Sequence, residues 1–244
     1  MNSRIFYDEL FNKFKKLVEK NDLFNEKISV EGKVLNSEEA IGNPLREDYP
    51  ILKGKEKLMQ AEFRGEKGQA FTDMPGAFTG TIKEIINRPL KTNFDRAVLI
   101  STINAVCKYL KITDTTIHCK DEEPEDCAER LVEYIKENYG LPKITLIGLQ
   151  PAMLERLSAY FQVRVVDLDI DKIGKVKFGV EIENAEEKTE EVLDWCELIL
   201  VTGSTVVNGT ITDFIMEKPV IFYGTSIAGT GALMNLKQFC VCSK

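Results

Sequence analysis

Residues 143–169 read KITLIGLQPAMLERLSAYFQVRVVDLD, and this stretch decides the fold. KITLIGL has the continuous apolar character of a buried strand, PAMLERLSAY has the pattern of a helix, and VRVVDLD is a second strand. Two such strands joined by a helix favour a right-handed crossover and parallel pairing. The stretch therefore predicts one βαβ unit of a parallel sheet.

The same alternation of strand and helix continues on both sides of this unit. TTIH (115–118) is a possible short strand, and residues 124–138 form a helix with proline near its start and Gly140 just past its end. Downstream, TEEVLDWCE (189–197) predicts a helix, LILVTG (198–203) a strand, TVVNGTITDFIM (205–216) a helix and PVIFYG (219–224) a strand. This order predicts a Rossmann-like, doubly wound α/β domain with a mostly parallel sheet.

The first part of the chain has a different pattern, typical of an α+β domain. Three short stretches alternate apolar and polar residues and predict strands: ISVEGKVL (28–35), MQAEFRG (59–65) and QAFTD (69–73). A hairpin turn is expected over Gly65–Gly68. Asn93 can cap the next helix, so we place the boundary between domains 1–92 and 93–244. Before these strands, one apolar stripe predicts an amphipathic helix and includes Ile5, Leu10, Phe11, Phe14, Leu17 and Val18.

Composition and charge exclude several classes of protein. The net charge is −7, and lysine and arginine are dispersed among acids, which argues against a nucleic-acid partner. The longest apolar runs are shorter than the roughly 18 residues that a membrane-spanning helix needs. The N-terminus lacks the apolar core of a targeting signal, so we expect a cytoplasmic protein with reduced cysteines. A homo-oligomer is compatible with the sequence.

Three of the predicted strands are followed by loops suited to a ligand. Gly148-Leu149-Gln150-Pro151, Thr202-Gly203-Ser204-Thr205 and Gly224-Thr225-Ser226 combine glycine with polar side chains. The carboxyl ends of parallel strands open on one edge of a sheet, so these loops should meet there. Asn208 lies four residues after Ser204 and can share its helix face. The alternative is that the hydroxyls only cap helices.

Asp167 lies 19 residues after Gly148, where an acidic residue would meet a ribose hydroxyl in a nucleotide-binding βαβ unit. The loop after Gly148 lacks the other glycines of the dinucleotide fingerprint, which disfavours NAD. A nucleoside remains compatible with this spacing, and a solvated strand end is the alternative.

His118, Cys119 and Cys127 combine soft ligands that suggest zinc, nickel or another thiophilic divalent metal. Cys127 also shares a helical stripe with Leu131 and Ile135, so a buried structural cysteine is the alternative. Cys240 and Cys242 alternate along FCVC, facing one side of an expected strand, and are further candidate ligands.

Polar and glycine-rich stretches in the first domain could line a cleft opposite the second. They include Gly42-Asn43-Pro44, Asp48-Tyr49-Pro50 and Lys53-Gly54-Lys55-Glu56. Turn formation explains much of the same composition.

LKGKEKLM through GQAFTD, HCKDEEPEDCA, and above all TGSTVVNGT followed by VIFYGTS resemble the putative heavy-metal chelation family. The resemblance implies an enolase N-terminal-like domain, a Rossmann-like domain and a site in the cleft between them. Carried onto this sequence, it implies that Gln150, Thr202, Ser204, Thr205, Asn208 and Thr225 line the site, with Gln69 and Thr72 facing them.

These observations lead to a first hypothesis, a metal-handling protein that holds a small anionic ligand or a metal complex in the interdomain cleft. The alternative is an enzyme on a small metabolite that uses a nucleoside cofactor such as S-adenosylmethionine. An interaction module fits less well, because polar loops at strand ends suit a concave site. A hydrolase triad is excluded, since the single histidine has no adjacent nucleophile elbow.

Overall fold

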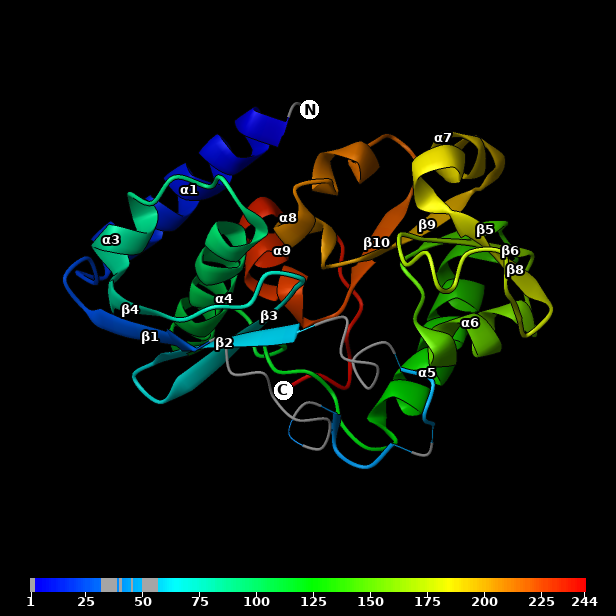
Figure 1. The fold of residues 1–244 in the computed structure, drawn as a ribbon, viewed down its shortest axis with the longest axis horizontal. Helices are drawn as coiled ribbons and strands as arrows, with labels where there is room; N and C mark the ends of the chain where they lie inside the picture. The colour runs from blue at the N-terminus through cyan, green and yellow to red at the C-terminus, as the bar shows by residue number, and fades with distance from the viewer. Residues whose placement is uncertain (1–2, 32–38, 40, 45, 50–56) are drawn as a thin grey trace.

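The structure is a computed structural model that describes residues 3–31, 39, 41–44, 46–49 and 57–244. Within these ranges it has a four-stranded antiparallel sheet and a six-stranded, mostly parallel sheet (Figure 1). The predicted fold class, an antiparallel α+β part followed by a parallel α/β part, is confirmed. In the described ranges, every helix is too short or too polar to cross a membrane.

The antiparallel sheet has the strand order β3-β2-β1-β4. Arg64 and Gly65, both with positive φ, form the tight turn between β2 and β3, so the hairpin is confirmed. The turn is shorter than predicted, because residues 66–68 already belong to β3. The end of the first predicted strand, residues 32–35, lies outside the described residues. The strands are β1 (Lys27–Glu31), β2 (Lys57–Phe63), β3 (Glu66–Thr72) and β4 (Phe78–Thr81).

Three helices accompany this sheet: α1 (Ser3–Lys20), α3 (Ile82–Ile86) and α4 (Asn93–Tyr109). The amphipathic helix α1 is confirmed, but Ile5 is 58% exposed and Phe6 is buried in its place. The N-cap of α4 is Thr92 rather than Asn93, because Thr92 and Asp95 form a reciprocal capping box. Helix α4 packs on β2 and β3.

The parallel sheet has the strand order β10-β9-β5-β6-β8-β7, and β7 alone runs antiparallel to its neighbour within the described sheet. The four strands predicted between residues 143 and 224 are confirmed. The hairpin of β7 and β8 was not predicted, because the two strands are short and separated only by Phe178 and Gly179. The strands are β5 (Ile144–Ile147), β6 (Val163–Asp167), β7 (Val176–Lys177), β8 (Val180–Asn184), β9 (Leu198–Thr202) and β10 (Val220–Tyr223).

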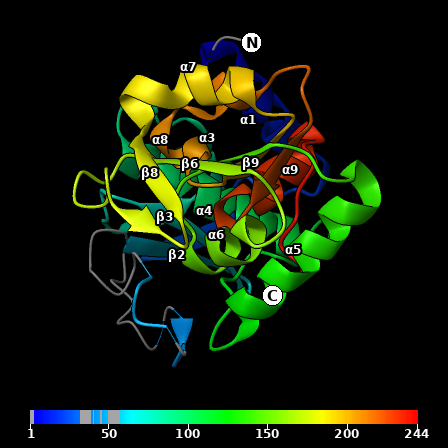
Figure 2. The same ribbon diagram turned by 90° about the vertical axis from the view of Figure 1, so that its right-hand side faces the viewer.

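Helices cover both faces of this sheet, with α7 on one side and α5 and α6 on the other (Figure 2).

One predicted helix is wrong: residues 205–216 break at Gly209, whose φ is 83°, into α8 and a 3-10 turn. The helices are α5 (Glu123–Tyr139), α6 (Pro151–Ser158), α7 (Ala185–Trp195), α8 (Thr205–Asn208) and α9 (Ala228–Met234), with the 3-10 turns η2 (Ile211–Phe214) and η3 (Thr225–Ile227).

Two of the predicted strands are also wrong. Residues 115–118 and 239–242 have irregular backbone. Both segments still form hydrogen bonds: Thr116 accepts from the Gln69 N–H, and Ile117 exchanges two backbone bonds with Lys244. The C-terminal segment therefore lies beside the segment that carries His118 and Cys119.

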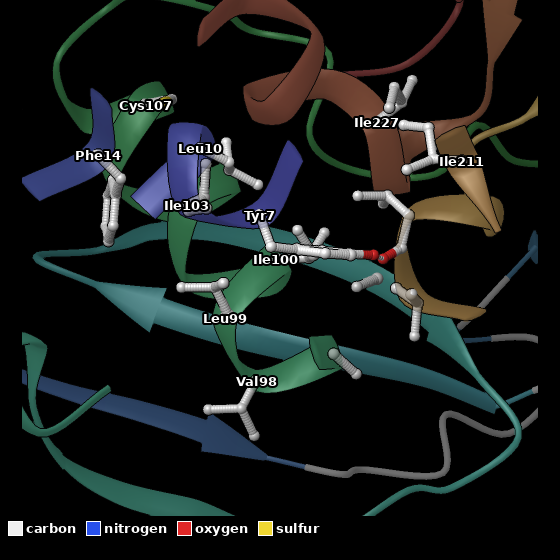
Figure 3. Packing of buried hydrophobic residues seen from close by; sticks show 14 of the residues in the cluster. Tyr7, Leu10, Phe14, Val98, Leu99, Ile100, Ile103, Cys107, Ile211 and Ile227 are labelled. Atoms are coloured by element: carbon white, nitrogen blue, oxygen red, sulfur yellow. Dashed lines mark hydrogen bonds between the residues drawn. The ribbon is translucent and has the colours of Figure 1, made fainter. Parts of the chain in front are cut away.

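One apolar core joins the two sheets (Figure 3). Leu10 and Phe14 of α1 and Ile100 and Ile103 of α4 pack in a cluster that extends to Ile199 of the parallel sheet. The division at residue 92 remains a prediction. In this packing α4, which that division assigns to the second domain, lies against the antiparallel sheet.

Candidate functional site

A cavity of about 640 Å³ lies at the carboxyl ends of β5, β6, β9 and β10. Its position follows from the fold, since these strands are parallel neighbours and their ends share one edge of the sheet. Ten of the residues predicted from the sequence line it: Gln150, Asp167, Thr202, Gly203, Ser204, Thr205, Asn208, His118, Cys119 and Cys127.

The loop after β9 forms one wall and is held by its own hydroxyls. The Thr202 and Ser204 side-chain oxygens are 3.1 Å apart, and the Thr205 hydroxyl donates to the Thr202 carbonyl at 2.8 Å. The Gly203 N–H donates to the Tyr223 carbonyl at 2.7 Å, which ties the loop to β10. Thr205 is therefore mainly a structural brace, whereas Ser204 is half-buried and faces the cavity.

Gly148 brings two strands close together at the floor of the cavity. Its φ is 85°, and a Cβ there would lie 2.8 Å from Thr202 Cγ2. The Tyr223 hydroxyl lies 2.7 Å from the Gly148 carbonyl and 3.0 Å from that of Ile147. Glycine is needed here both for the left-handed backbone and for the close contact.

Asp167 lines the cavity but also braces the neighbouring loop. Its Oδ2 accepts the Leu149 N–H at 2.8 Å, and its Oδ1 accepts the Asp169 N–H at 2.8 Å. Lys172 Nζ lies 3.6 Å from the same carboxylate. These contacts account for an acidic residue at this strand end without a ribose.

Gln150 and Asn208 differ in how much of each side chain is free. Gln150 is the N-cap of α6, and its Oε1 accepts the Met153 N–H at 2.5 Å. Asn208 is half-buried, and its side-chain amide has no hydrogen-bond partner among the described residues. Asn208 is therefore the better placed of the two to contact a ligand.

The structure places three predicted residues, Gln69, Thr72 and Thr225, outside the cavity lining. Gln69 is buried, donates to Gln60 and accepts the His118 N–H at 2.8 Å. Thr72 accepts the Met74 N–H, and Thr225 is fully buried. Their polar groups hold loops around the cavity.

His118, Cys119 and Cys127 line the same cavity, but they do not form a preformed metal site. Within the described ranges, His, Cys, Asp and Glu side chains nowhere form a set of three that could hold one ion. Cys127 packs with Leu131 and Ile135, as in the structural alternative, and still reaches the cavity. His118 packs edge-on against Phe71, and its buried Nδ1 has no partner among the described residues.

We expect the metal-free chain to lose stability as the pH falls below about 6.5. Burial lowers the pKa of His118 from its ordinary value, so the unfolded chain takes up a proton before the folded chain does. The free energy of unfolding then falls with decreasing pH, by at most about 1.4 kcal/mol per pH unit, and levels off below the folded pKa. Urea unfolding at several pH values, with a chelator present, measures this slope.

The matched variant for this prediction is His118→Gln, which cannot take up the proton but retains the backbone N–H that bonds Gln69. Its unfolding free energy should depend less on pH between 7.5 and 5.5. An identical pH dependence in both proteins would show that His118 does not contribute to it.

The sequence did not identify several residues that complete the cavity. Tyr49, from a stretch that was only a candidate for a cleft, forms part of its wall, and so does Ile41, which precedes another such stretch. Pro50 and residues 53–56 lie outside the described residues. The Ser226 hydroxyl accepts the Phe71 N–H at 2.9 Å and ties β3 to the loop after β10. Thr189 of α7 also lines the cavity, and no sequence signal marks it.

The charges around the cavity are acidic. Asp167, Glu186 and Asp213 belong to the lining, and the described lining includes neither lysine nor arginine. Glu186 and Asp213 make no ion pair within the described part of the chain. The potential inside the cavity therefore favours a cation over an anion.

Comparisons with known proteins confirm the family resemblance. Residues 131–228 match the model of the DUF364 family, whose description is putative heavy-metal chelation. A DUF364 protein of unknown function from Pyrococcus horikoshii has a similar structure, with a TM-score of 0.52 and 15% identity over 89% of this chain and 79% of that one. A second, from Desulfitobacterium hafniense, has a TM-score of 0.50 and 10% identity over 73% and 71%. No curated protein matches the chain.

Proposed function

We propose, starting from the match of residues 131–228 to the putative heavy-metal chelation family, that this protein binds a metal ion or a positively charged metal complex in the cavity described above. The proposal retains the metal-handling hypothesis. It replaces the small anionic ligand by a cation.

The observation that carries the proposal is the absence of lysine and arginine from the described lining, together with the carboxylates of Glu186 and Asp213. The third carboxylate, Asp167, already has Lys172 at 3.6 Å. A phosphate or carboxylate ligand would need positive partners, which proteins usually supply as arginine, lysine or a helix N-terminus. Helices α6 and α7 begin at this edge of the cavity, but Gln150 and Asn184 already cap them with their own side chains. Here an anion would approach Glu186 and Asp213 without a compensating cation. A metal cation is attracted by the same groups.

The size and donor types of the cavity also support a metal complex. Hydroxyls from Thr202 and Ser204, the Asn208 amide and thiols from Cys119, Cys127 and Cys240 all belong to its lining. A volume of about 640 Å³ lies in the range of small-molecule sites and exceeds what a bare ion fills. A hydrated or chelated ion suits this space.

The alternative, an enzyme with a nucleoside cofactor, rests on Asp167 as the ribose partner. Because both of its carboxylate oxygens already accept backbone N–H groups, Asp167 is explained without a nucleoside. We therefore propose binding of a metal or metal complex ahead of nucleoside chemistry.

The charge argument predicts that Thr189→Lys weakens metal binding at least tenfold. A lysine ammonium about 12 Å from a bound monovalent cation costs roughly 1.4 kcal/mol at an effective dielectric constant of 20, and more for a divalent ion. Calorimetric titration of the untagged protein with Ni(II), Zn(II) and Cu(I), the last without oxygen, measures the affinity.

Thr189→Met is the matched control, since it has a similar length and no charge. Both variants lose the same local hydrogen bond, from the Thr189 hydroxyl to the Ala185 carbonyl. Thr189→Met should bind the same metals within about threefold of the parent. Equal affinities for the two variants, or a parent protein that binds none of the three ions, would contradict the proposal.

A further inference from the structure

The cavity has two walls of different character, one on each face of the parallel sheet. Helix α7 covers one face, and α5 and α6 cover the other (Figure 2). Residues from all three helices line the cavity, and the strand ends between them form its floor. The cavity therefore extends across the edge of the sheet from one face to the other.

The wall on the α7 face carries two carboxylates that make no ion pair within the described part of the chain. Glu186 lies in the first turn of α7, and Asp213 belongs to η2. Ile211 and Phe214 of η2 pack in the same core cluster as Val192 of α7, which places η2 on this face. We call this side, defined by Glu186 and Asp213, the acidic wall.

The wall on the opposite face is mostly apolar. Leu149 precedes α6, Met153 lies in the first turn of that helix, and both belong to the core cluster on this face. Tyr49 joins them, because its hydroxyl donates at 2.8 Å to Glu125 in the first turn of α5. We call this side, defined by Tyr49, Leu149 and Met153, the apolar wall.

Asp167, at the end of β6, adds no unpaired charge to the apolar wall. Its carboxylate accepts the Leu149 N–H at 2.8 Å and has Lys172 Nζ at 3.6 Å. The unpaired negative charge of the described lining is therefore on the acidic wall. A ligand that satisfies both walls has a cationic side and an apolar side.

Aromatic side chains enlarge the apolar surface of the cavity. The lining includes Tyr49, Phe71, Phe214 and Tyr223. The hydroxyl of Tyr223 is already bonded to the Gly148 carbonyl, and that of Tyr49 is bonded as described above, so each residue can offer its ring to a ligand. Aromatic rings pack well on flat aromatic ligands and attract cations.

The protein does not supply a coordination sphere for a bare ion. Within the described ranges, His, Cys, Asp and Glu side chains nowhere place three donors around one point. Zn(II) usually takes four ligands in protein sites, so most of the ligands must arrive with the ion. Water can supply them, but a hydrated ion is polar on every side and gains nothing from the apolar wall. An organic chelator supplies both the ligands and an apolar surface.

We propose that the ligand of the cavity is a cationic metal chelate, in which an organic chelator with an apolar, aromatic body supplies the coordination. The protein contacts only the outer surface of this complex. Its charged side faces the acidic wall, and the body of the chelator packs against the apolar wall. The proposal rests on the proposed function and names its ligand class. Bare ions are attracted by the same carboxylates and bind more weakly.

Two exchange-inert complexes of equal charge test the assignment: tetraammine(phenanthroline)rhodium(III) and hexaamminerhodium(III). Neither exchanges its ligands for protein groups during a titration, so a difference in affinity reports contact with the phenanthroline body. By calorimetry we expect the phenanthroline complex to bind at least about tenfold more tightly, because its rings bury apolar surface. Equal affinities, or tighter binding of the hexaammine complex, would overturn the proposal.

Free phenanthroline supplies the opposite control, since it keeps the apolar body and lacks the charge. It should bind at least about tenfold more weakly than its rhodium complex, because the carboxylates of the acidic wall attract only the cation. Free phenanthroline that binds as tightly as the complex would overturn the proposal.

Met153→Gln makes the apolar wall polar with little change in side-chain length and none in charge. It should weaken binding of the phenanthroline complex by about fivefold or more and leave hexaammine binding within about twofold. Met153→Leu, the apolar control, should bind both complexes within about threefold of the parent. An equal effect of Met153→Gln on the two complexes would overturn the assignment of the apolar wall. Met153 is buried, so urea unfolding checks each variant, and the comparison of complexes on the parent decides if Met153→Gln does not fold.

The two proposals fail in different ways. Binding of Ni(II), Zn(II) or Cu(I) that is as tight as that of the phenanthroline complex, and that Thr189→Lys weakens, would retain the cation site and overturn the chelate. Tighter binding of the phenanthroline complex that responds equally to Thr189→Lys and Thr189→Met would retain the contact with the chelator and contradict the charge argument for the cavity.

Discussion

Replacing Asn104 by Ala is expected to lower the free energy of unfolding by about 4 kcal/mol. The Asn104 amide donates to the Gln69 carbonyl at 2.8 Å and the Thr225 carbonyl at 3.0 Å, and its Oδ1 accepts the Gly229 N–H at 2.7 Å. The side chain is fully buried, so Ala removes the side-chain partner of the Gln69 carbonyl and of the Gly229 N–H, and it leaves the Thr225 carbonyl with only the Ala228 N–H. Chemical denaturation of the parent and the variant measures the difference.

Ser101→Ala is the control for this prediction. Ser101 is fully buried in the same helix, but its hydroxyl donates only to the Ala97 and Val98 carbonyls within α4. Removing this hydroxyl should lower the free energy of unfolding by less than about 1.5 kcal/mol. Similar losses for Asn104→Ala and Ser101→Ala would mean that Asn104 does not join β3 to the loop after β10.

The second large effect is expected for Gly68→Ala, which should destabilise the fold by about 4 kcal/mol. A Cβ at Gly68 would lie 2.2 Å from the Ala105 nitrogen and 2.4 Å from the Ser101 oxygen. Both are backbone atoms of α4, so the whole helix must move away from β3. Thermal and chemical unfolding both measure the loss.

Gly65→Ala separates backbone strain from this clash. At Gly65 φ is 86°, but an added Cβ meets no atom within 4 Å. Gly65→Ala should lower the free energy of unfolding by about 1–2 kcal/mol, because alanine is strained in the left-handed backbone conformation. A Gly68→Ala variant as stable as Gly65→Ala would contradict the close packing of α4 on β3.

These contacts connect the fold to the site. Asn104 fixes η3 and β3 relative to α4, and the Phe71 N–H then reaches the Ser226 hydroxyl at the cavity wall. Substitutions that loosen α4 should therefore weaken ligand binding as well as stability. The wall of the cavity depends on packing between the two sheets.

Local pattern was enough to predict the parallel sheet, because its central strands are short apolar runs between helices. KITLIGL and LILVTG are buried on both faces, which produces the continuous apolar signal. The β7–β8 hairpin has no such signal, since it lies at the sheet edge and its strands are half exposed. Likewise, the helical pattern of residues 205–216 did not reveal that Gly209 ends α8.

The candidate site was predictable where it follows from strand ends. Ser204 and Asn208 reach the cavity because they follow β9, as the strand-end rule requires. Thr225 also follows a strand, but it is fully buried outside the cavity lining, so the strand-end rule alone does not select the residues that face the cavity. Gln69 came from the family resemblance, and its placement depends on hydrogen bonds between distant segments. The position of the C-terminal segment beside His118 and Cys119 depends on the backbone hydrogen bonds between Lys244 and Ile117, which no local pattern contains.

The central claim, that a metal binds in the cavity at the carboxyl ends of the parallel strands, is tested most directly by anomalous diffraction at the copper edge from crystals grown with Cu(I) under anaerobic conditions. We predict one strong anomalous peak per chain inside the cavity. Peaks confined to the molecular surface, with an empty cavity in the same crystal, would contradict the claim.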